Sequence, residues 1–286
     1  MPQITLRSPA KINLRLEALR KRPDGYHDIE TVFERIDLCD ELTLRTIPKD
    51  IVVRCDNPQV PCDQRNLAYK AAIILKERYP ALPGVEMTLK KNIPVAAGLG
   101  GASSNCAYAL LGLNRLWDLD LEKEEIFGLG SSLGADVAFF LLDCGRAVGR
   151  GKGEILEEVP KGSGFWYLLV NPGFPVLTKE VYSGLNLGLT SGGVGSRIDL
   201  QLLKEIGFED LENFLFNSLE APVEHKHAAI SDMKSALLKA GLRFAMMSGS
   251  GPTVFGVART REEALGAADR LVSKEGWLAF VTTTLW

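Results

Sequence analysis

Five short stretches of the 286-residue chain place glycine, hydroxyl or charged residues beside apolar runs, a setting that suits binding and catalysis. The most informative is PVAAGLGGASSN, residues 94–105, where three glycines precede two serines and a long apolar run. A glycine loop that leads into a helix can bind an anion, because exposed N–H groups and the helix dipole favour negative charge. A tight turn that needs glycine for its dihedral angles explains the same residues, so both interpretations stand.

The loop matches neither of two common nucleotide motifs. It is not a Walker A sequence, because no Lys-Ser or Lys-Thr follows its last glycine. It is not a dinucleotide fingerprint, because Ser103 occupies the position of the third glycine. Ser103 and Ser104 are suited to cap the following helix, and they could also donate to a phosphate or approach a metal bound to it.

Charged residues in SPAKINL and SSLGADVAFFLL form a second group. Strand alternation puts Lys11 and Asn13 on one face of residues 8–14, although a solvated edge strand gives the same pattern. Asp136 lies between a small-residue turn and a very apolar run, so we expect a partly buried carboxylate that needs a cation. A helix cap is an equally good interpretation of Asp136.

Two further stretches follow turn signals. In PDGYHDIETVF, Tyr26 and His27 come after a turn glycine and could stack on and hydrogen-bond a planar base. A loop anchored by the tyrosine ring explains the pair as well. In AMMSGSGPTVFGVA, residues 249–251 separate two strands and form either a plain hairpin or a turn that contacts phosphate or substrate.

Hydrophobic periodicity predicts the elements that position these residues. Period-two alternation predicts several β segments in the first 60 residues, then a helix over 66–79 and a strand over 85–93. Two helices follow, one from Ser103 or Ser104 and one over 121–134. The second half predicts strands alternating with helices, with a loop at 191–196, which is typical of a split βαβ or ferredoxin-like module. A glycine-rich boundary near residue 160 divides the chain into domains of residues 1–160 and 161–286.

Composition restricts the class of protein. The net charge of −3 argues against nucleic acid or an anionic membrane as the main partner. Five scattered cysteines match no zinc spacing, and free thiols are the better interpretation. The N-terminal segment lacks a signal pattern and no apolar run is long enough to span a membrane, so we expect a cytoplasmic protein.

The order of the five stretches resembles the three motifs of the GHMP small-molecule kinases together with a substrate loop. The resemblance covers residues 8–256 and implies an α+β fold of two domains. The first is similar to ribosomal protein S5 and the second is ferredoxin-like, with ATP and substrate in the cleft between them. It further implies ATP with Mg²⁺ as cofactor and, from the combination of PAKINL with DGYH, a cytidyl diphosphate sugar alcohol as substrate.

The resemblance also assigns residues. Lys11 and Asp136 correspond to the catalytic pair, which would give Asp136 its cation. The positions assigned to ATP are Pro94, Ala96, Ala97, Gly98, Leu99, Gly100, Gly101, Ala102, Ser103 and Ser104, with Asn66 and Lys90. The positions assigned to the substrate are Asn13, Tyr26, His27, Asp136, Lys152 and Tyr182, and no protein metal ligand is assigned.

Two residues depart from the family pattern. Ala102 replaces a glycine of the usual GGGSSN, and Ala138 replaces a proline after GADV. The methyl group of Ala102 would strain the loop if that position needs a positive φ. Two functions compete with this interpretation. One is another GHMP kinase with a small acid as substrate, and the other is a ligand-binding regulator without catalysis.

Overall fold

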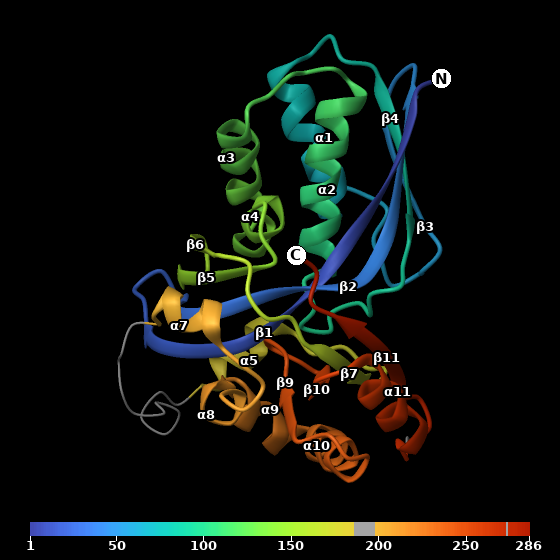
Figure 1. Cartoon of the computed structure of the whole chain (residues 1–286). Helices are drawn as coiled ribbons and strands as arrows, with labels where there is room; N and C mark the ends of the chain where they lie inside the picture. The colour runs from blue at the N-terminus through green and yellow to red at the C-terminus, as the bar shows by residue number, and fades with distance from the viewer. Residues whose placement is uncertain (186–197, 273) are drawn as a thin grey trace. The chain divides into compact units, whose positions relative to one another are not determined.

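The computed structural model describes residues 1–185, 198–272 and 274–286, and the predicted loop at 191–196 lies outside these residues (Figure 1). Contacts divide the chain into two compact units. Unit 1 comprises residues 1–10, 39–95 and 100–143, and unit 2 comprises residues 11–38, 96–99 and 144–286. This division into units differs from the expected division at residue 160, because strands β1 (Gln3–Lys21) and β2 (His27–Ile47) each contribute residues to both units. The family boundary at 160 stays a prediction.

Unit 1 is a sheet with helices on one face (Figure 1). Strand β3 (Ile51–Cys55) runs parallel to β4 (Gly84–Lys90), and β4 runs antiparallel to the second half of β2. In β4 the alternate residues Val85, Met87 and Leu89 are buried, as their period-two spacing predicts. The helices of unit 1 are α1 (Leu67–Arg78), α2 (Gly101–Leu116), α3 (Lys123–Leu133) and α4 (Ala135–Leu141).

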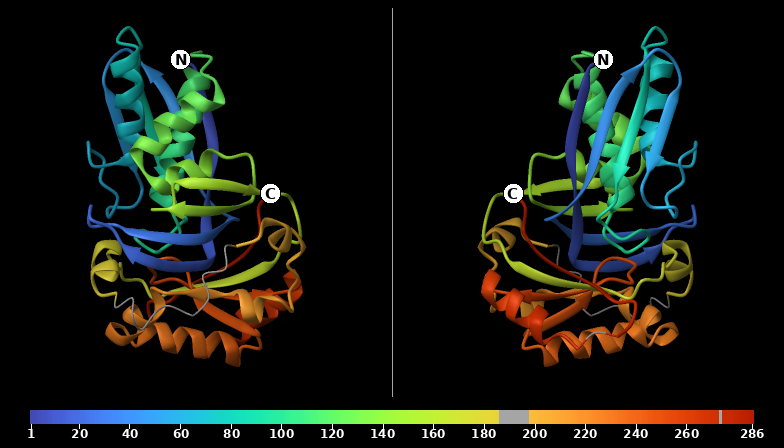
Figure 2. Two further views of the ribbon diagram at one scale, coloured as in Figure 1. Left: turned by 90° about the vertical axis from the view of Figure 1, so that its left-hand side faces the viewer. Right: turned by 90° about the vertical axis from the view of Figure 1, so that its right-hand side faces the viewer.

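Unit 2 contains the ferredoxin-like module that the sequence predicts. Its four-stranded antiparallel sheet has the order β11 (Leu278–Thr283), β7 (Trp166–Asn171), β10 (Val254–Ala258), β9 (Phe244–Met247). In chain order this is 4-1-3-2, the arrangement of two interleaved βαβ units. Helices α10 (Ala229–Lys239) and α11 (Arg261–Arg270) pack on this sheet (Figure 2).

The remaining strands of unit 2 pair with the second half of β1 and the first half of β2. Strand β5 (Arg146–Gly151) pairs antiparallel with both β2 and β6 (Ile155–Val159), and β8 (Phe216–Asn217) pairs parallel with β1. Short helices complete the unit: α5 (Thr178–Ser183), α7 (Leu200–Glu205), α8 (Leu211–Phe214) and α9 (Glu220–Lys226). Helix and strand therefore mix in both units, which agrees with the predicted α+β class.

Two global expectations can be compared with the structure. No cysteine pair is joined by a disulfide within the described residues. None of the helices described is both long and apolar enough to traverse a bilayer.

A buried polar cluster ties β2 to the core of unit 2. Glu34 and Arg146 are fully buried and form an ion pair, with Arg146 Nε 2.7 Å from Glu34 Oε2. The hydroxyls of Tyr167 and Thr284 donate to the other carboxylate oxygen of Glu34. Burial, with the nearby carboxylate of Glu34, raises the pKa of the Tyr167 hydroxyl well above its ordinary value.

Glu34→Gln should lower the free energy of unfolding by about 3–5 kcal/mol, because it leaves the Arg146 guanidinium buried without its counter-charge. Urea denaturation followed by circular dichroism measures the change. Asp143→Asn is the matched control, since Asp143 is 93% exposed and its partner Lys123, 3.9 Å away, is 86% exposed. Equal midpoints for Glu34→Gln and the wild type would contradict the expectation.

Candidate active site

The Lys11 and Asn13 side chains are buried on β1, at 5% and 1% exposure. The alternative of a solvated edge strand is therefore wrong. The two side chains also interact directly, because Lys11 Nζ donates to Asn13 Oδ1 over 2.7 Å. One cation and one amide thus form a preorganised polar pair in unit 2.

Thr31, on β2, fixes the orientation of this pair. Its hydroxyl donates to the carbonyl of Arg15 at 2.7 Å, and Asn13 Nδ2 donates to the same hydroxyl at 2.7 Å. Because the single hydroxyl proton is used on Arg15, the amide nitrogen must point to Thr31 and the amide oxygen to Lys11. Thr31 lies within the stretch PDGYHDIETVF, but the spacing there gave no reason to single it out.

The stretch AMMSGSGPTVFGVA forms a hairpin between β9 and β10 that also reaches these residues, and its contact with phosphate or substrate stays a prediction. Ser248 Oγ accepts from the backbone N–H of Asn13 at 3.3 Å and donates to the carbonyl of Gly98 at 3.1 Å. Gly249 has a φ of +55°, and a Cβ there would lie 3.3 Å from Lys11 Nζ. Residues from three predicted stretches therefore meet within unit 2.

The glycine loop has its carbonyl groups bonded and its N–H groups open. In unit 2, the carbonyls of Ala96 and Ala97 accept from Val176 and Thr253, and that of Leu99 accepts from the backbone of Lys11 at 3.0 Å. By contrast, the backbone N–H groups of residues 98–103 donate to no other group in the described part of the chain. Open amides beside a helix start suit an anion.

Helix α2 begins earlier than the sequence predicts. Its N-cap is Gly100, in the left-handed region with a φ of +69°, and no side chain caps it. Ser103 and Ser104 are the third and fourth residues of the helix, so their predicted role as N-caps is wrong. Glycine at the cap position provides no oxygen to occupy the first N–H groups, which leaves them available to a ligand.

Asp136 lies in unit 1, as the second residue of α4, and is partly buried as expected. The capping alternative is wrong, because the N-cap of α4 is Gly134. A carboxylate in the first turn is stabilised by the positive end of the helix dipole.

An aromatic cluster surrounds the β1–β2 turn in unit 2. The rings of His27 and Tyr182 lie 5.3 Å apart at 31°, and Lys152 Nζ lies 4.8 Å from the centre of the Tyr26 ring. Tyr26 is 61% exposed and His27 is 7% exposed. Burial lowers the pKa of the His27 imidazole, and the Lys21 ammonium lowers it further, so the ring is neutral near pH 7. A neutral, buried imidazole next to a ring can both stack and hydrogen-bond.

Comparisons with known proteins now decide the family. Residues 66–143 match the model of the GHMP kinases N terminal domain, and residues 197–276 match that of the GHMP kinases C terminal. A protein of Pelobacter propionicus named 4-diphosphocytidyl-2-C-methyl-D-erythritol kinase is 43% identical, with both chains covered completely. The chain belongs to the GHMP kinase family.

Further relatives agree with this assignment. A Geobacter metallireducens protein of the same name is 40% identical over the full length of both chains. A crystal structure of a 4-(cytidine 5'-diphospho)-2C-methyl-D-erythritol kinase is 31% identical with a TM-score of 0.81, covering 99% of this chain and all of that one. A homoserine kinase of Cytophaga hutchinsonii, 20% identical with a TM-score of 0.73 over 100% and 95% of the two chains, shares the fold.

The two departures from the GHMP kinase pattern fit the backbone. Ala102 is the second residue of α2 and does not have a positive φ, so its methyl group causes no strain there. Ala138 is the fourth residue of α4 and is buried. The strained residue of the loop is instead Ala96, with a φ of +50°.

Two predicted nucleotide positions have clear structural environments. Asn66 is the N-cap of α1, where its side chain accepts from the Ala68 N–H and donates to the Pro61 carbonyl at 2.8 Å. Lys90 is exposed, on the opposite face of β4 from the buried Leu89. Contact of either residue with ATP stays a prediction.

Gly98→Ala should destabilise the chain by at least about 2 kcal/mol, because alanine resists positive φ and its Cβ would lie 2.1 Å from the Ser248 carbonyl oxygen. Ala96→Gly should stay within about 1 kcal/mol of the wild type, because relief of strain offsets the entropy of glycine. Thermal unfolding of both variants measures the contrast. Similar losses in both would contradict it.

Stability should fall with decreasing pH through His27. Its pKa is lower in the folded chain than the value of about 6.5 expected unfolded, so the unfolded state binds more protons as the pH drops below that value. The melting temperature of the wild type should therefore decline more steeply than that of His27→Gln between about pH 7.5 and about pH 5.5. His225→Gln, at an exposed position on α9, is the matched control. Parallel curves for wild type and His27→Gln would refute the shift.

Proposed function

We propose that this GHMP kinase transfers the γ-phosphoryl group of ATP to the 2-hydroxyl of 4-diphosphocytidyl-2-C-methyl-D-erythritol, a step in non-mevalonate isoprenoid precursor biosynthesis. Relatives with that kinase activity in their names are 40–43% identical over the whole chain. The observation on this chain that carries the proposal is the His27–Tyr182 ring pair with Tyr26 beside it. Such a cluster suits a flat base, which mevalonate and homoserine lack.

The cytosine ring would stack against Tyr26 and Tyr182 while His27 hydrogen-bonds its edge. His27 is neutral near pH 7, so its imidazole has one donor and one acceptor nitrogen for a base that also carries both. The Lys152 ammonium, 4.8 Å from the Tyr26 ring centre, is available to the diphosphate of the same substrate. These residues would therefore select the cytidyl diphosphate portion.

The open N–H groups of the glycine loop would hold the β- and γ-phosphates of ATP. Bonded carbonyls on residues 96–99 keep the acceptor side of the loop away from the anion. Pro94, Ala96 and Ala97 would shape the entry to the loop, and Asn66 with Lys90 would approach the nucleoside part.

In the chemical step the substrate hydroxyl oxygen forms a bond to the γ-phosphorus while the bond from that phosphorus to the β–γ bridging oxygen breaks, releasing ADP. Asp136 would accept the hydroxyl proton, and the Lys11 ammonium would stabilise the charge that develops on oxygen. Asn13, oriented by Thr31, would hold the substrate. Most of the rate enhancement in phosphoryl transfer comes from such positioning and charge stabilisation.

One oxygen donor of unit 1 fits Mg²⁺. Ser104 Oγ is buried with no hydrogen-bond partner among the described residues, so this hydroxyl oxygen could serve as a ligand. Ser104 would approach the ion, which would neutralise phosphate charge when bound, and Asp136 keeps its role as the base.

Asp136→Asn should lower kcat by about 10²–10⁴-fold, because the amide cannot accept the proton, and Lys11→Ala should lower kcat by a similar factor. The melting temperature and the Kd of an ATP analogue should stay near wild type for Asp136→Asn. Coupled measurement of ADP release determines kcat. Full activity of Asp136→Asn would refute its role as base.

The same ADP-release assay tests the proposed function as a whole. The wild type should release ADP with the cytidyl substrate and not with mevalonate or homoserine, and CMP should raise the melting temperature. Activity on a small acid alone would indicate another GHMP kinase. Binding of the cytidyl compound without ADP release would indicate a regulator without catalysis.

A further inference from the structure

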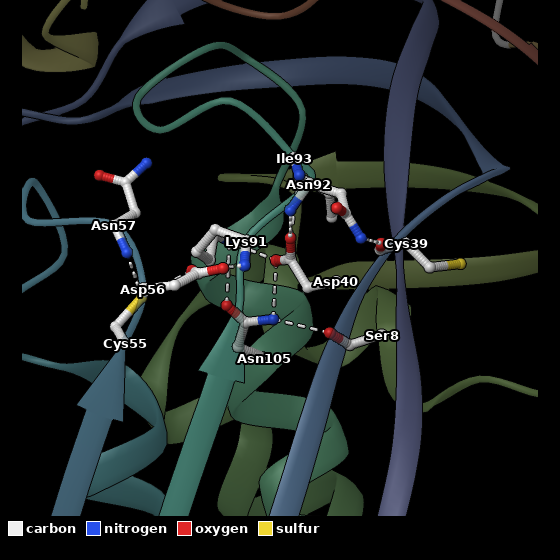
Figure 3. Close-up of polar contacts among 10 residues, drawn as sticks. All are labelled: Ser8, Cys39, Asp40, Cys55, Asp56, Asn57, Lys91, Asn92, Ile93 and Asn105. Atoms are coloured by element: carbon white, nitrogen blue, oxygen red, sulfur yellow. Dashed lines mark hydrogen bonds and ion pairs between the residues drawn. The ribbon is translucent and has the colours of Figure 1, made fainter.

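A fully buried carboxylate in unit 1 lies next to the ends of the glycine loop (Figure 3). Asp40, on β2, is 1% exposed. One of its oxygens accepts from the backbone N–H groups of Asn92 and Ile93, both at 2.9 Å. The other accepts from the Lys91 ammonium and from Asn105 Nδ2, the latter at 2.9 Å. Both oxygens are thus occupied by groups of the protein.

The partners of Asp40 flank the loop on both sides in sequence. Asn92 and Ile93 come directly before Pro94, where the loop starts, and Asn105 is the fifth residue of α2, which follows it. A single carboxylate therefore joins the entry to the loop with the helix at its exit. Lys91 Nζ strengthens this connection, because it also donates to Asn105 Oδ1 at 3.1 Å.

The start of α2 packs closely against the same residues. A Cβ at Gly101 would lie 3.0 Å from Ile93 Cγ2 and 3.3 Å from Lys91 Nζ. The amide nitrogen of Asn105 that donates to Asp40 also donates to Ser8 Oγ at 2.6 Å. A change at Asp40 would therefore shift Ile93 or Asn105, and with them the N-terminal turn of α2.

The Lys91 ammonium balances the charge of Asp40, so the pair adds no net negative charge beside the glycine loop. Both side chains are buried, at 4% and 0% exposure. A buried ion pair contributes little net stability compared with apolar residues of the same volume. Apolar residues could not replace the hydrogen bonds of Asp40. Its carboxylate accepts from the consecutive backbone N–H groups of Asn92 and Ile93 and from the Asn105 side chain on α2.

We propose that Asp40 is a positioning residue for the nucleotide: through Ile93 and Asn105 it sets the N–H groups at the start of α2 for the phosphates of ATP. The role rests on the proposed function, since it concerns the donor of the same reaction. Asp40 itself touches no substrate, because its carboxylate is enclosed by protein groups. Its effect falls on nucleotide affinity and leaves the cytidyl site of unit 2 unchanged.

The test compares two ligands on the full-length chain by calorimetry: a non-hydrolysable ATP analogue and CDP. Asp40→Asn retains an oxygen for the two backbone N–H groups but points an amide donor at Lys91 and Asn105. We expect its Kd for the ATP analogue to rise at least about tenfold while its Kd for CDP changes less than about twofold. In the kinase assay, KM for ATP should rise in the same ratio as that Kd.

Two variants separate positioning from general loss of stability. Glu34→Gln breaks a buried ion pair in unit 2, so it should lower the melting temperature and leave the Kd for the ATP analogue unchanged. Asn105→Ala removes the hydrogen bonds of α2 to Asp40, Lys91 and Ser8 and keeps the Asp40–Lys91 pair. This variant should fold, and its Kd for the ATP analogue should still rise severalfold. The role of Asp40 can therefore be decided even if Asp40→Asn fails to fold.

A charge-neutral replacement provides the rescue. Asp40→Asn combined with Lys91→Met removes the unmatched ammonium and keeps an acceptor for Asn92 and Ile93, so the double variant should recover part of the lost ATP affinity. The proposal is overturned if Asn105→Ala binds the ATP analogue with the Kd of the wild type. It is also overturned if Glu34→Gln raises the Kd for the analogue as much as Asp40→Asn does. A wild type that binds the analogue but transfers no phosphoryl group would refute the proposed function alone, since the binding comparison still decides the role of Asp40.

Discussion

The proposed anion site depends on one constraint. The backbone N–H groups of residues 98–103 must stay without an acceptor within the described protein. Most of these residues are only partly buried, so water can satisfy their N–H groups until a ligand replaces it. The loop meets the requirement by turning its carbonyl groups to protein donors. Glycines with positive φ at positions 98 and 100 make that reversal of the backbone possible.

Each unit stabilises the part of the loop that belongs to it. In unit 2, donors from Lys11, Val176, Ser248 and Thr253 reach the carbonyls of residues 96–99. In unit 1, Asp40 holds the residues before the loop and the helix after it. The two sets of contacts are of different kinds, because one uses neutral hydrogen bonds and the other a buried charge with four donors. The positive φ of Ala96 is the strain that this arrangement leaves in the loop.

Local elements could be predicted from the sequence because periodicity and turn residues act over short distances. The ferredoxin-like sheet, the helices and the buried face of β4 all follow from such patterns. The start of α2 was misplaced because the capping rule looks for a side-chain oxygen, whereas Gly100 caps by its backbone alone. Contacts between distant residues gave no sequence signal: Ser248 lies 150 residues from Gly98, and Asp40 lies 51 residues from Lys91.

The sites proposed here for the phosphoryl donor and for the acceptor use different buried polar groups. In unit 1, the Asp40 carboxylate accepts hydrogen bonds from residues at the start of α2 and before the loop. In unit 2, the neutral His27 imidazole and the Tyr182 ring form part of the proposed base site. Because these groups share no residue, their contributions to binding should be nearly additive. Lys11 and Asn13 form a third set, held by Thr31 and Ser248. For a reaction whose barrier falls mainly through positioning, these separate proposed sites would allow each ligand to be aligned without disturbing the other.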